Sequence, residues 1–374
     1  MTVRRTTIIL VICVAYIGLN FAYTLHGNVG HRWAALAIAV TPVLFIRLRS
    51  DEFALLVGAV GLSTLFVLKL LVYEEFYLTG MILIPLVFIA IALQRVSFSN
   101  PLLSSFLAST GAVVFSLWVL YGLYISGVAT NEMTAFSRNT ITTISLSTFV
   151  LTLLLCREVS YESPVWWYVI CAGLMVAVVS IHMGRTGILT SLFTLFILAF
   201  ILYKKSKGVA ILFSCVILSL AYYFSSGLMY GIHELPALMR IAEMGTDSPR
   251  WMIWSTVLEE IGSPRTLLGL ESDLSTRLTG YAWHNGYLQA YSFYGAIGFM
   301  VLVAFLIACQ YRAFLWSTEI GLAVAAVLVR AFFDDQLINP YVGIILVLVW
   351  LPPMTYYFSN RKSQKNKPNL RCTV

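Results

Sequence analysis

Residues 53–73 decide the fold class: they read FALLVGAVGLSTLFVLKLLVY, with Lys69 as the only charged residue. A helix that crosses the hydrocarbon layer of a bilayer needs about 20 mostly apolar residues, and this stretch meets that requirement. The run is too long and too uniform for a strand of a membrane barrel, in which apolar residues alternate over about ten positions. The stretch therefore predicts a transmembrane helix.

The composition of the whole chain points the same way. Its 374 residues are 59% hydrophobic and only 11% charged, whereas a soluble domain carries about 25% charged residues. So few charges cannot cover a globular surface, which excludes a soluble enzyme. Intrinsic disorder is excluded as well, because that state needs low hydrophobicity and high charge. We expect an all-α polytopic membrane protein in which residues 1–374 form a single transmembrane domain.

The same length criterion gives about twelve candidate spans along the chain. They lie near 6–25, 33–48, 53–73, 77–93, 102–125, 140–156, 164–183, 187–203, 208–226, 285–308, 316–332 and 340–358.

Basic residues in the loops predict the orientation, because lysine and arginine favour the cytoplasmic side. If the N-terminus is cytoplasmic, the alternate loops and the basic tail at 359–374 hold six of the seven lysines. Both termini are then cytoplasmic, in agreement with an even number of spans. The net charge of +7 suits anionic lipid headgroups and does not indicate a nucleic-acid partner. The outward side carries eight arginines and no lysine, so topology alone does not explain these arginines.

One outward segment, residues 227–284 between the ninth and tenth predicted spans, is much longer than the other loops. Within it, Ser248-Pro249 is typical of a helix start and Gly262 of a helix end. Between them, Trp251, Trp254, Leu258 and Ile261 recur at helical spacing. We expect an amphipathic helix here, suited to the bilayer interface or to packing over the spans, and a second, less regular helix at 234–244. In the structural interpretation this periplasmic segment is a lid over the membrane domain.

Two outward arginines stand at predicted helix starts. Arg185 follows Gly184 at the start of the eighth span, where free amide groups and the helix dipole favour an anion. Its guanidinium adds a forked donor that matches phosphate oxygens, although an interfacial arginine also contacts lipid headgroups. Arg250 lies in the first turn of the loop helix, where a cation needs a compensating anion. This anion is supplied either by Asp247 or by a phosphate-bearing ligand.

His284 stands at the start of the tenth span, and we expect it in the first helical turn. The helix dipole disfavours a cationic imidazole there, so a neutral His284 could accept a proton near pH 7. A polar cap is the alternative role. Asp334 and Asp335, at the outward end of the eleventh span, are candidates to orient His284 or to pair with an arginine, or they form a solvated pair. The sequence contains no His-Glu-x-x-His motif. Glu271-Ser272-Asp273 has a spacing that could hold a divalent metal, but this pattern is very weak, and we expect no metal.

These residues fall in a pattern that resembles the O-antigen ligase and polymerase superfamily of bacterial envelope glycosyltransferases. The motif of that family is found here as His284-Asn285, nine residues, and then Gly295-x-x-Gly298. Residues 250–254 (RWMIW) and 264–269 (PRTLLG) are similar to the arginine-led helix and the Pro-x-x-Leu-Leu-Gly turn of the family. The resemblance covers about residues 180–340. Phe299 departs from the threonine that many ligases have at that position.

The resemblance implies a GT-C-like fold and a donor glycan linked to undecaprenyl diphosphate, handled on the periplasmic face of the bacterial inner membrane without a metal or another cofactor. Arg185 and Arg250 would hold the diphosphate, and His284 would activate the acceptor hydroxyl. Asn285, Asp334 and Asp335 are possible orienting or acceptor-side groups. Three aromatic residues could stack on sugar rings, with interfacial anchoring as the alternative: Trp251, Trp283 and Tyr287.

The resemblance leaves the acceptor open. A ligase would transfer the glycan to lipid A-core, whereas a polymerase would transfer it to a second lipid-linked glycan. A flippase or another transporter is the alternative outside the enzyme class. Charges inside spans, which are expected along a transport path, are nearly absent, with Lys69 as the clearest exception.

Overall fold

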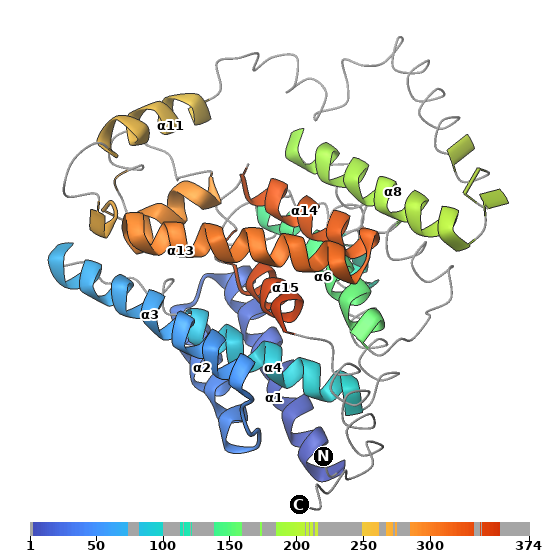
Figure 1. Ribbon diagram of the computed structural model, residues 1–374, viewed down its shortest axis with the longest axis horizontal. Helices are drawn as coiled ribbons and strands as arrows, with labels where there is room; N and C mark the ends of the chain where they lie inside the picture. Colours follow the sequence, from blue (N-terminus) through green and yellow to red (C-terminus); the bar gives the residue numbers. More distant parts are fainter. Residues whose placement is uncertain are drawn as a thin grey trace, which may run out of the picture.

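The structure is a computed structural model of the 374-residue chain (Figure 1). It describes residues 3–73, 82–99, 113–114, 116–119, 121, 138–158, 173, 185–205, 207–208, 210–211, 214–215, 249–261, 267–271, 274, 285–332, 337 and 339–351. All regular structure within these ranges is helical, and they contain no strand. The predicted all-α class is therefore confirmed for the described part of the chain.

The helices are α1 (Val3–His26), α2 (Val29–Val40), η1 (Thr41–Leu44), α3 (Ser50–Tyr73), α4 (Leu83–Ser99), α6 (Arg138–Glu158), α8 (Arg185–Lys205), α11 (Pro249–Glu260), α13 (Gly286–Trp316), α14 (Thr318–Phe332) and α15 (Pro340–Trp350). Three of them contain a stretch long and apolar enough to cross a membrane: Arg5–His26, Ser50–Tyr73 and Gly286–Trp316. The chain is thus a helical protein with membrane-compatible helices.

Nine of the predicted spans coincide with described helices, although their boundaries differ by several residues. The second predicted span begins earlier than expected, since α2 starts at Val29 and continues as the 3-10 turn η1. The tenth extends eight residues further, to Trp316. Three predicted spans, 102–125, 164–183 and 208–226, lie mostly outside the described residues, as do the helix predicted at 234–244 and the basic tail. The total of twelve spans stays a prediction.

Two helical hairpins organise the chain. Gly27 has a φ of 66° and ends α1, because glycine adopts this left-handed conformation without a Cβ clash. The side chain of Asn28 then accepts a hydrogen bond from the backbone N–H of Gly30 and starts α2. In the second hairpin only Ser317 separates α13 from α14. Each hairpin therefore packs two neighbouring helices antiparallel (Figure 1).

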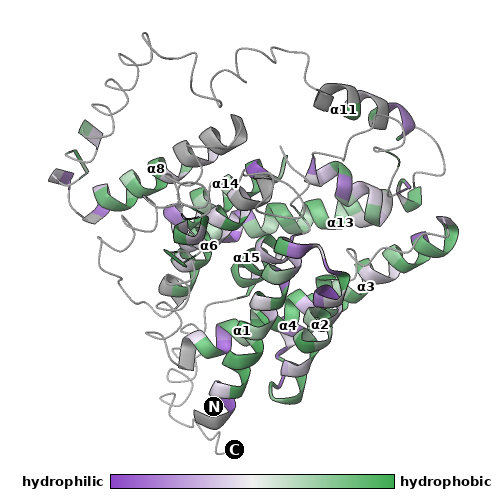
Figure 2. Cartoon of the chain, turned by 180° about the vertical axis from the view of Figure 1, so that it is seen from behind, coloured by the Kyte–Doolittle hydropathy of each residue, from purple (hydrophilic) through white to green (hydrophobic). Residues whose placement is uncertain are grey.

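A single large apolar core joins α1–α4, α6, α8 and α13–α15. The outer faces of several helices are apolar as well: Leu71 is 72% exposed, and Ile307 and Leu315 are each 66% exposed. Figure 2 shows hydrophobic residues along most of the length of α3 and α13. Apolar residues at this density on both the inner and the outer faces of helices suit a lipid environment.

A buried ion-pair cluster joins the start of α3 to α4. The carboxylate of Glu52 is fully buried and accepts charge-assisted bonds from Arg49 at 2.9 Å and from Arg95 at 2.6 Å. It also accepts a hydrogen bond of 2.7 Å from the backbone N–H of Arg49. A buried charge is tolerated only when it is paired and hydrogen-bonded, and Glu52 meets both conditions. The cluster fixes the turn before α3 against α4.

Candidate functional site

The site begins at the N-terminus of α13. Asn285 is buried and caps the helix, since its Oδ1 accepts hydrogen bonds from the backbone N–H groups of Tyr287 at 2.9 Å and Leu288 at 3.1 Å. The side chain is therefore used for capping. His284 itself lies outside the described residues, directly before this cap. The described part of α13 begins at Gly286, so the position expected for His284 in the first helical turn stays untested.

A sharp kink divides α13 into two arms. Gly295 has a φ of 67° and a ψ of −175°, a conformation that is essentially restricted to glycine. The first arm, residues 286–294, turns back over the second (Figure 1). Accordingly, Tyr287 of the first arm lines the same surface groove as Val303 and Ile307 of the second. The kink places the start of α13 beside the middle of the same helix.

The first arm is anchored to α14 by Tyr287. Its hydroxyl donates a hydrogen bond of 3.1 Å to the backbone carbonyl of Leu328. Its ring packs against Phe332, with the centroids 6.1 Å apart. Tyr287 was one of the three aromatic residues expected to stack on a sugar or to anchor at an interface. The contacts show that Tyr287 joins two helices, and both the sugar-stacking role and the interfacial role stay predictions.

The turn at 267–269 docks directly against the kink. A Cβ on Gly295 would lie only 2.7 Å from the carbonyl carbon of Leu268 and 2.9 Å from the backbone nitrogen of Gly269. Gly269 also has a positive φ, 108°, and faces the backbone of Ser292. The two glycines thus allow two backbone segments to touch. The structure therefore brings together the Leu-Leu-Gly end of the Pro-x-x-Leu-Leu-Gly segment and the first glycine of the Gly-x-x-Gly motif.

Hydrogen bonds fix this turn in place. The Ser292 hydroxyl donates to the carbonyl of Leu270 at 3.0 Å, and the backbone N–H of Leu270 donates to the carbonyl of Ser292 at 3.2 Å. From α3, the Tyr73 hydroxyl donates to the carbonyl of Gly269 at 3.1 Å. The second motif glycine, Gly298, packs against α3, where a Cβ would lie 3.2 Å from Leu65 Cδ1. The sequence did not identify Tyr73 and Ser292 as residues that hold this turn. The only feature of the sequence that pointed to the contact was the spacing of the glycines.

The loop helix α11 packs over the same region. It begins at Pro249, as predicted, so Arg250 does lie in its first turn. The side chains of Arg250 and Trp251 are outside the described part of the chain. Ile253 is fully buried in a small apolar cluster with Leu270, Leu274 and Tyr291.

The predicted apolar stripe of α11 was wrong in part. The stripe omitted Ile253, which is the buried residue, and it included Leu258, which is 57% exposed. Trp254 lies on the packed side as expected, with its ring centroid 5.3 Å from that of Phe332. The packed face is displaced because the partner is the 270–274 segment and the first arm of α13.

The helix α8 begins at Arg185, as predicted. Near its other end Lys204 forms an ion pair of 2.9 Å with Glu319, which lies in the first turn of α14. The two helices are therefore antiparallel, and Arg185 starts α8 at the end of the bundle where α14 ends with Phe332. The side chain of Arg185 is outside the described residues, as are Trp283, Asp334 and Asp335. Their distances from His284 stay untested.

The start of α13 and the middle of α11 consequently lie at the C-terminal end of α14, and α8, which is antiparallel to α14, begins at that end of the bundle (Figure 1). Trp254 of α11 and Tyr287 of α13 both contact Phe332 at this end. Helix N-termini carry a partial positive charge, which favours an anionic ligand. In α13, however, the Asn285 side chain already binds the backbone N–H groups of Tyr287 and Leu288. Among the described residues, no three histidine, cysteine or acidic side chains come together as metal ligands would.

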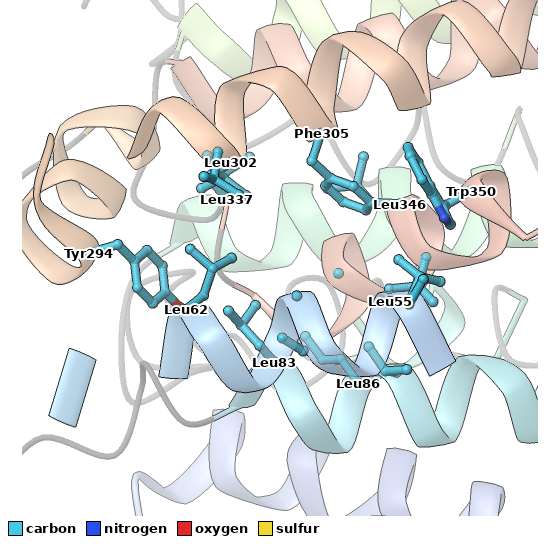
Figure 3. A pocket seen from close by; sticks show the side chains of 17 residues that line it. Leu55, Leu62, Leu83, Leu86, Tyr294, Leu302, Phe305, Leu337, Leu346 and Trp350 are labelled. Carbon is cyan, nitrogen blue, oxygen red and sulfur yellow. The ribbon is translucent and has the colours of Figure 1, made fainter. Parts of the chain in front are cut away.

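An apolar cavity of about 220 Å³ lies below the kink, between α3, α4, α13 and α15. Tyr294, next to the kink, lines one end of the cavity, and Leu55 and Trp350 line the other (Figure 3). Leucine and phenylalanine side chains point into it from all sides (Figure 3). The cavity therefore offers an apolar chain a path from the region of the motif glycines towards the opposite end of α3.

Comparisons of the chain with protein-family models, with curated proteins and with solved structures find no match.

Proposed function

We propose that the chain is a glycosyltransferase of the bacterial inner membrane, with about twelve spans, both termini cytoplasmic and the active site facing the periplasm. It would transfer an undecaprenyl-diphosphate-linked O-antigen or similar polysaccharide to an acceptor hydroxyl. The acceptor would be lipid A-core for a ligase, or a second lipid-linked glycan for a polymerase. The proposal rests on the resemblance of residues 180–340 to the O-antigen ligase and polymerase superfamily.

One observation carries the proposal beyond the resemblance. Three separate segments that resemble family motifs are in contact: the arginine-led helix α11, the turn at 267–269, and the glycine-kinked start of α13. Segments that serve only as lipid-facing spans have no reason to interlock through two positive-φ glycines. These contacts hold the three segments in fixed positions relative to one another, which supports a preorganised site.

In the proposed reaction, Arg185 and Arg250 hold the two phosphates and stabilise the negative charge that grows on the leaving group. The oxygen of the acceptor hydroxyl attacks the anomeric carbon from the face opposite the diphosphate. The bond between that carbon and the phosphate oxygen breaks, and undecaprenyl diphosphate leaves. His284 takes the hydroxyl proton as general base. The anomeric configuration is therefore inverted, and no metal takes part.

The apolar cavity suits the lipid part of this donor. A polyprenyl chain is an apolar ligand, and apolar ligands bind in apolar grooves with few polar groups. The cavity ends at Tyr294, one residue before the kink, so a chain bound there would have its polar end near the motif segments. We assign this cavity, of about 220 Å³, to the few isoprene units of the polyprenyl chain that lie nearest the diphosphate.

The proposal is tested with the purified protein in liposomes that contain a defined undecaprenyl-diphosphate glycan. One series receives lipid A-core, and the other receives only more donor. Product on lipid A-core supports a ligase, and lengthened lipid-linked glycan supports a polymerase. Transfer without an ion gradient would exclude transport as the sole activity. No transfer in either series, by protein that still binds the donor, would contradict the proposal.

His284→Ala is the most specific test of the proposed general base. It should abolish transfer while donor binding remains, because the base acts on the acceptor and not on the diphosphate. His233→Ala, the same change elsewhere in the long loop, should transfer at the wild-type rate. Wild-type transfer by His284→Ala would rule out the assigned base.

A further inference from the structure

The hairpin of α1 and α2 contains a buried arginine that the proposed reaction does not use. Arg32 is only 8% exposed and lies in the first turn of α2. One guanidinium nitrogen, Nη1, donates a hydrogen bond of 2.9 Å to Oδ1 of Asn20. The guanidinium carbon lies 5.1 Å from the centroid of the Tyr23 ring. Both partners are neutral.

The charge of Arg32 has no acidic counterpart among the described residues. The ion pairs found there join Arg49, Arg95 and Lys204 to carboxylates, and none involves Arg32. A buried charge without a counter-ion is costly. The position in the first turn of α2 increases this cost, because a helix N-terminus repels a cation. A bound anion would remove both costs.

The neighbours of Arg32 hold it in one geometry. The Asn20 amide nitrogen donates to the carbonyl of Tyr16 at 2.9 Å, which aims its oxygen at Arg32. The Thr24 hydroxyl donates to the carbonyl of Asn20 at 2.9 Å. A fixed guanidinium loses little conformational entropy when it binds, so this arrangement suits recognition.

A second group next to Arg32 also points to a ligand. Nδ1 of His31 is buried and has no hydrogen-bond partner in the described part of the chain. Its ring lies 6.3 Å from that of His26, between centroids. A buried polar atom normally has a hydrogen-bond partner, so a buried nitrogen without one indicates that a partner is missing. The unpartnered nitrogen of His31 thus lies next in sequence to the uncompensated charge of Arg32, and an oxyanion could satisfy both.

The Arg32 region adjoins the start of α13. Tyr341, at the start of α15, lies within electrostatic range of the guanidinium. Leu337, just before α15, is so close to Gly286 that a Cβ on that glycine would lie 2.7 Å from the Leu337 Cβ. The ends of α1, α2, α13 and α15 therefore meet at one end of the bundle.

We propose that Arg32 and His31 form a phosphate-binding site at this end of the bundle. The guanidinium fork matches phosphate oxygens better than any other side chain, and a protonated ring nitrogen of His31 adds one donor. The phosphate belongs either to a phosphorylated glycolipid or to an anionic phospholipid headgroup. The site uses residues other than those of the proposed diphosphate clamp, and phosphate binding there does not depend on glycan transfer.

The test is lipid binding by the full-length protein in a neutral detergent, followed by native mass spectrometry. The probes are bisphosphorylated lipid A and phosphatidylglycerol, titrated separately. Arg32→Gln should raise the dissociation constant of the probe that binds about tenfold or more, the loss expected for a charge-assisted hydrogen bond. Arg47→Gln, the same change at an exposed arginine, should raise it about fivefold at most. If Arg32→Gln weakens the binding of lipid A alone, the phosphate at this site belongs to a glycolipid. If it weakens the binding of phosphatidylglycerol alone, the phosphate belongs to a phospholipid headgroup.

Asn20→Asp keeps the test decisive even if Arg32→Gln does not fold. The new carboxylate would stand 2.9 Å from Nη1 and neutralise Arg32 from inside the protein. We expect the folded variant to lose phosphate binding about tenfold or more, as Arg32→Gln does. If Asn20→Asp folds and binds both probes as the wild type does, Arg32 serves only the packing of the hairpin and the proposal fails.

Discussion

The contact between Gly295 and the turn at 267–269 gives the most specific prediction, for the substitution Gly295→Ala. An alanine would have to adopt a φ of 67° with a ψ of −175°. That region is almost exclusive to glycine, and its occupation by another residue costs about 1–3 kcal/mol. The alanine Cβ would also lie 2.7 Å from the Leu268 carbonyl carbon, so the turn would have to move away.

Detachment of the turn breaks three hydrogen bonds: two between Ser292 and Leu270, and one from Tyr73 to Gly269. Each contributes about 1 kcal/mol net, or about 3 kcal/mol in total. With the backbone strain, Gly295→Ala should destabilise the protein by about 4–6 kcal/mol. At roughly 2 °C per kcal/mol for a chain of this size, Tm should fall by about 10 °C.

The assay is thermal unfolding of the detergent-solubilised protein, followed by tryptophan fluorescence. Gly61→Ala is the matched control, since Gly61 lies within helix α3 and a Cβ there meets nothing within 4 Å. That control should leave the stability unchanged or raise it by up to about 1 kcal/mol. Ser292→Ala, which loses one hydrogen bond, should cost about 1 kcal/mol.

Coupling between the two glycines is a stricter form of the same test. Gly269→Ala should destabilise the protein by a similar amount, because its Cβ would collide with the backbone of Ser292. Once either substitution has separated the segments, the other has less to disrupt. The decrease in the free energy of unfolding should therefore be clearly smaller for the double variant than the sum of the decreases for the two single variants. Additive effects, or a Gly295→Ala variant as stable as Gly61→Ala, would refute the docking.

Three further variants test other contacts. Glu52→Gln leaves Arg95 without its carboxylate partner and Arg49 with Asp51 alone, and it should cost about 3–5 kcal/mol in thermal unfolding, whereas the more exposed Asp51→Asn should cost less than about 1 kcal/mol. Tyr287→Phe loses the hydrogen bond to Leu328 and should cost about 1 kcal/mol in the same assay; a wild-type Tm would contradict that contact. Arg185→Lys should slow glycan transfer in liposomes, because an ammonium group lacks the bidentate fork; full activity would argue against the clamp.

The helices were predictable because long apolar runs leave few alternatives, but the end of α13 was not. The apolar run suggested an end near residue 308, whereas the helix continues to Trp316. Its last turns contain polar side chains that find partners on neighbouring helices. Gln310 donates to the carbonyl of Gly321 at 2.9 Å, and the Arg312 guanidinium stacks on Trp350, 4.5 Å from a ring centroid. Such partners come from packing and are invisible to a hydropathy criterion.

The candidate site was predictable only as a set of helix starts. Capping and anion signals are local, so the starts of α8 and α11 were predicted at the observed residues. The conformation of Gly295 was not predictable, because its cause is a turn 26 residues earlier in the chain. The packed face of α11 was misjudged for the same reason. Ile253 is buried by partners, Leu270 and Tyr291, that helical spacing does not reveal.

The contacts also give the Gly-x-x-Gly spacing a physical meaning. Gly295 meets the turn at 267–269, whereas Gly298, one helical turn later, meets Leu62 and Leu65 of α3. Between them, Ile297 is 57% exposed and takes part in neither contact. The motif therefore constrains two backbone approaches and leaves an intervening side chain free. Since one glycine sets the kink and the other seats the helix on α3, the start of α13 is positioned by backbone contacts. A larger residue at either glycine should displace Asn285 and whatever precedes it, whereas substitution of Ile297 should not.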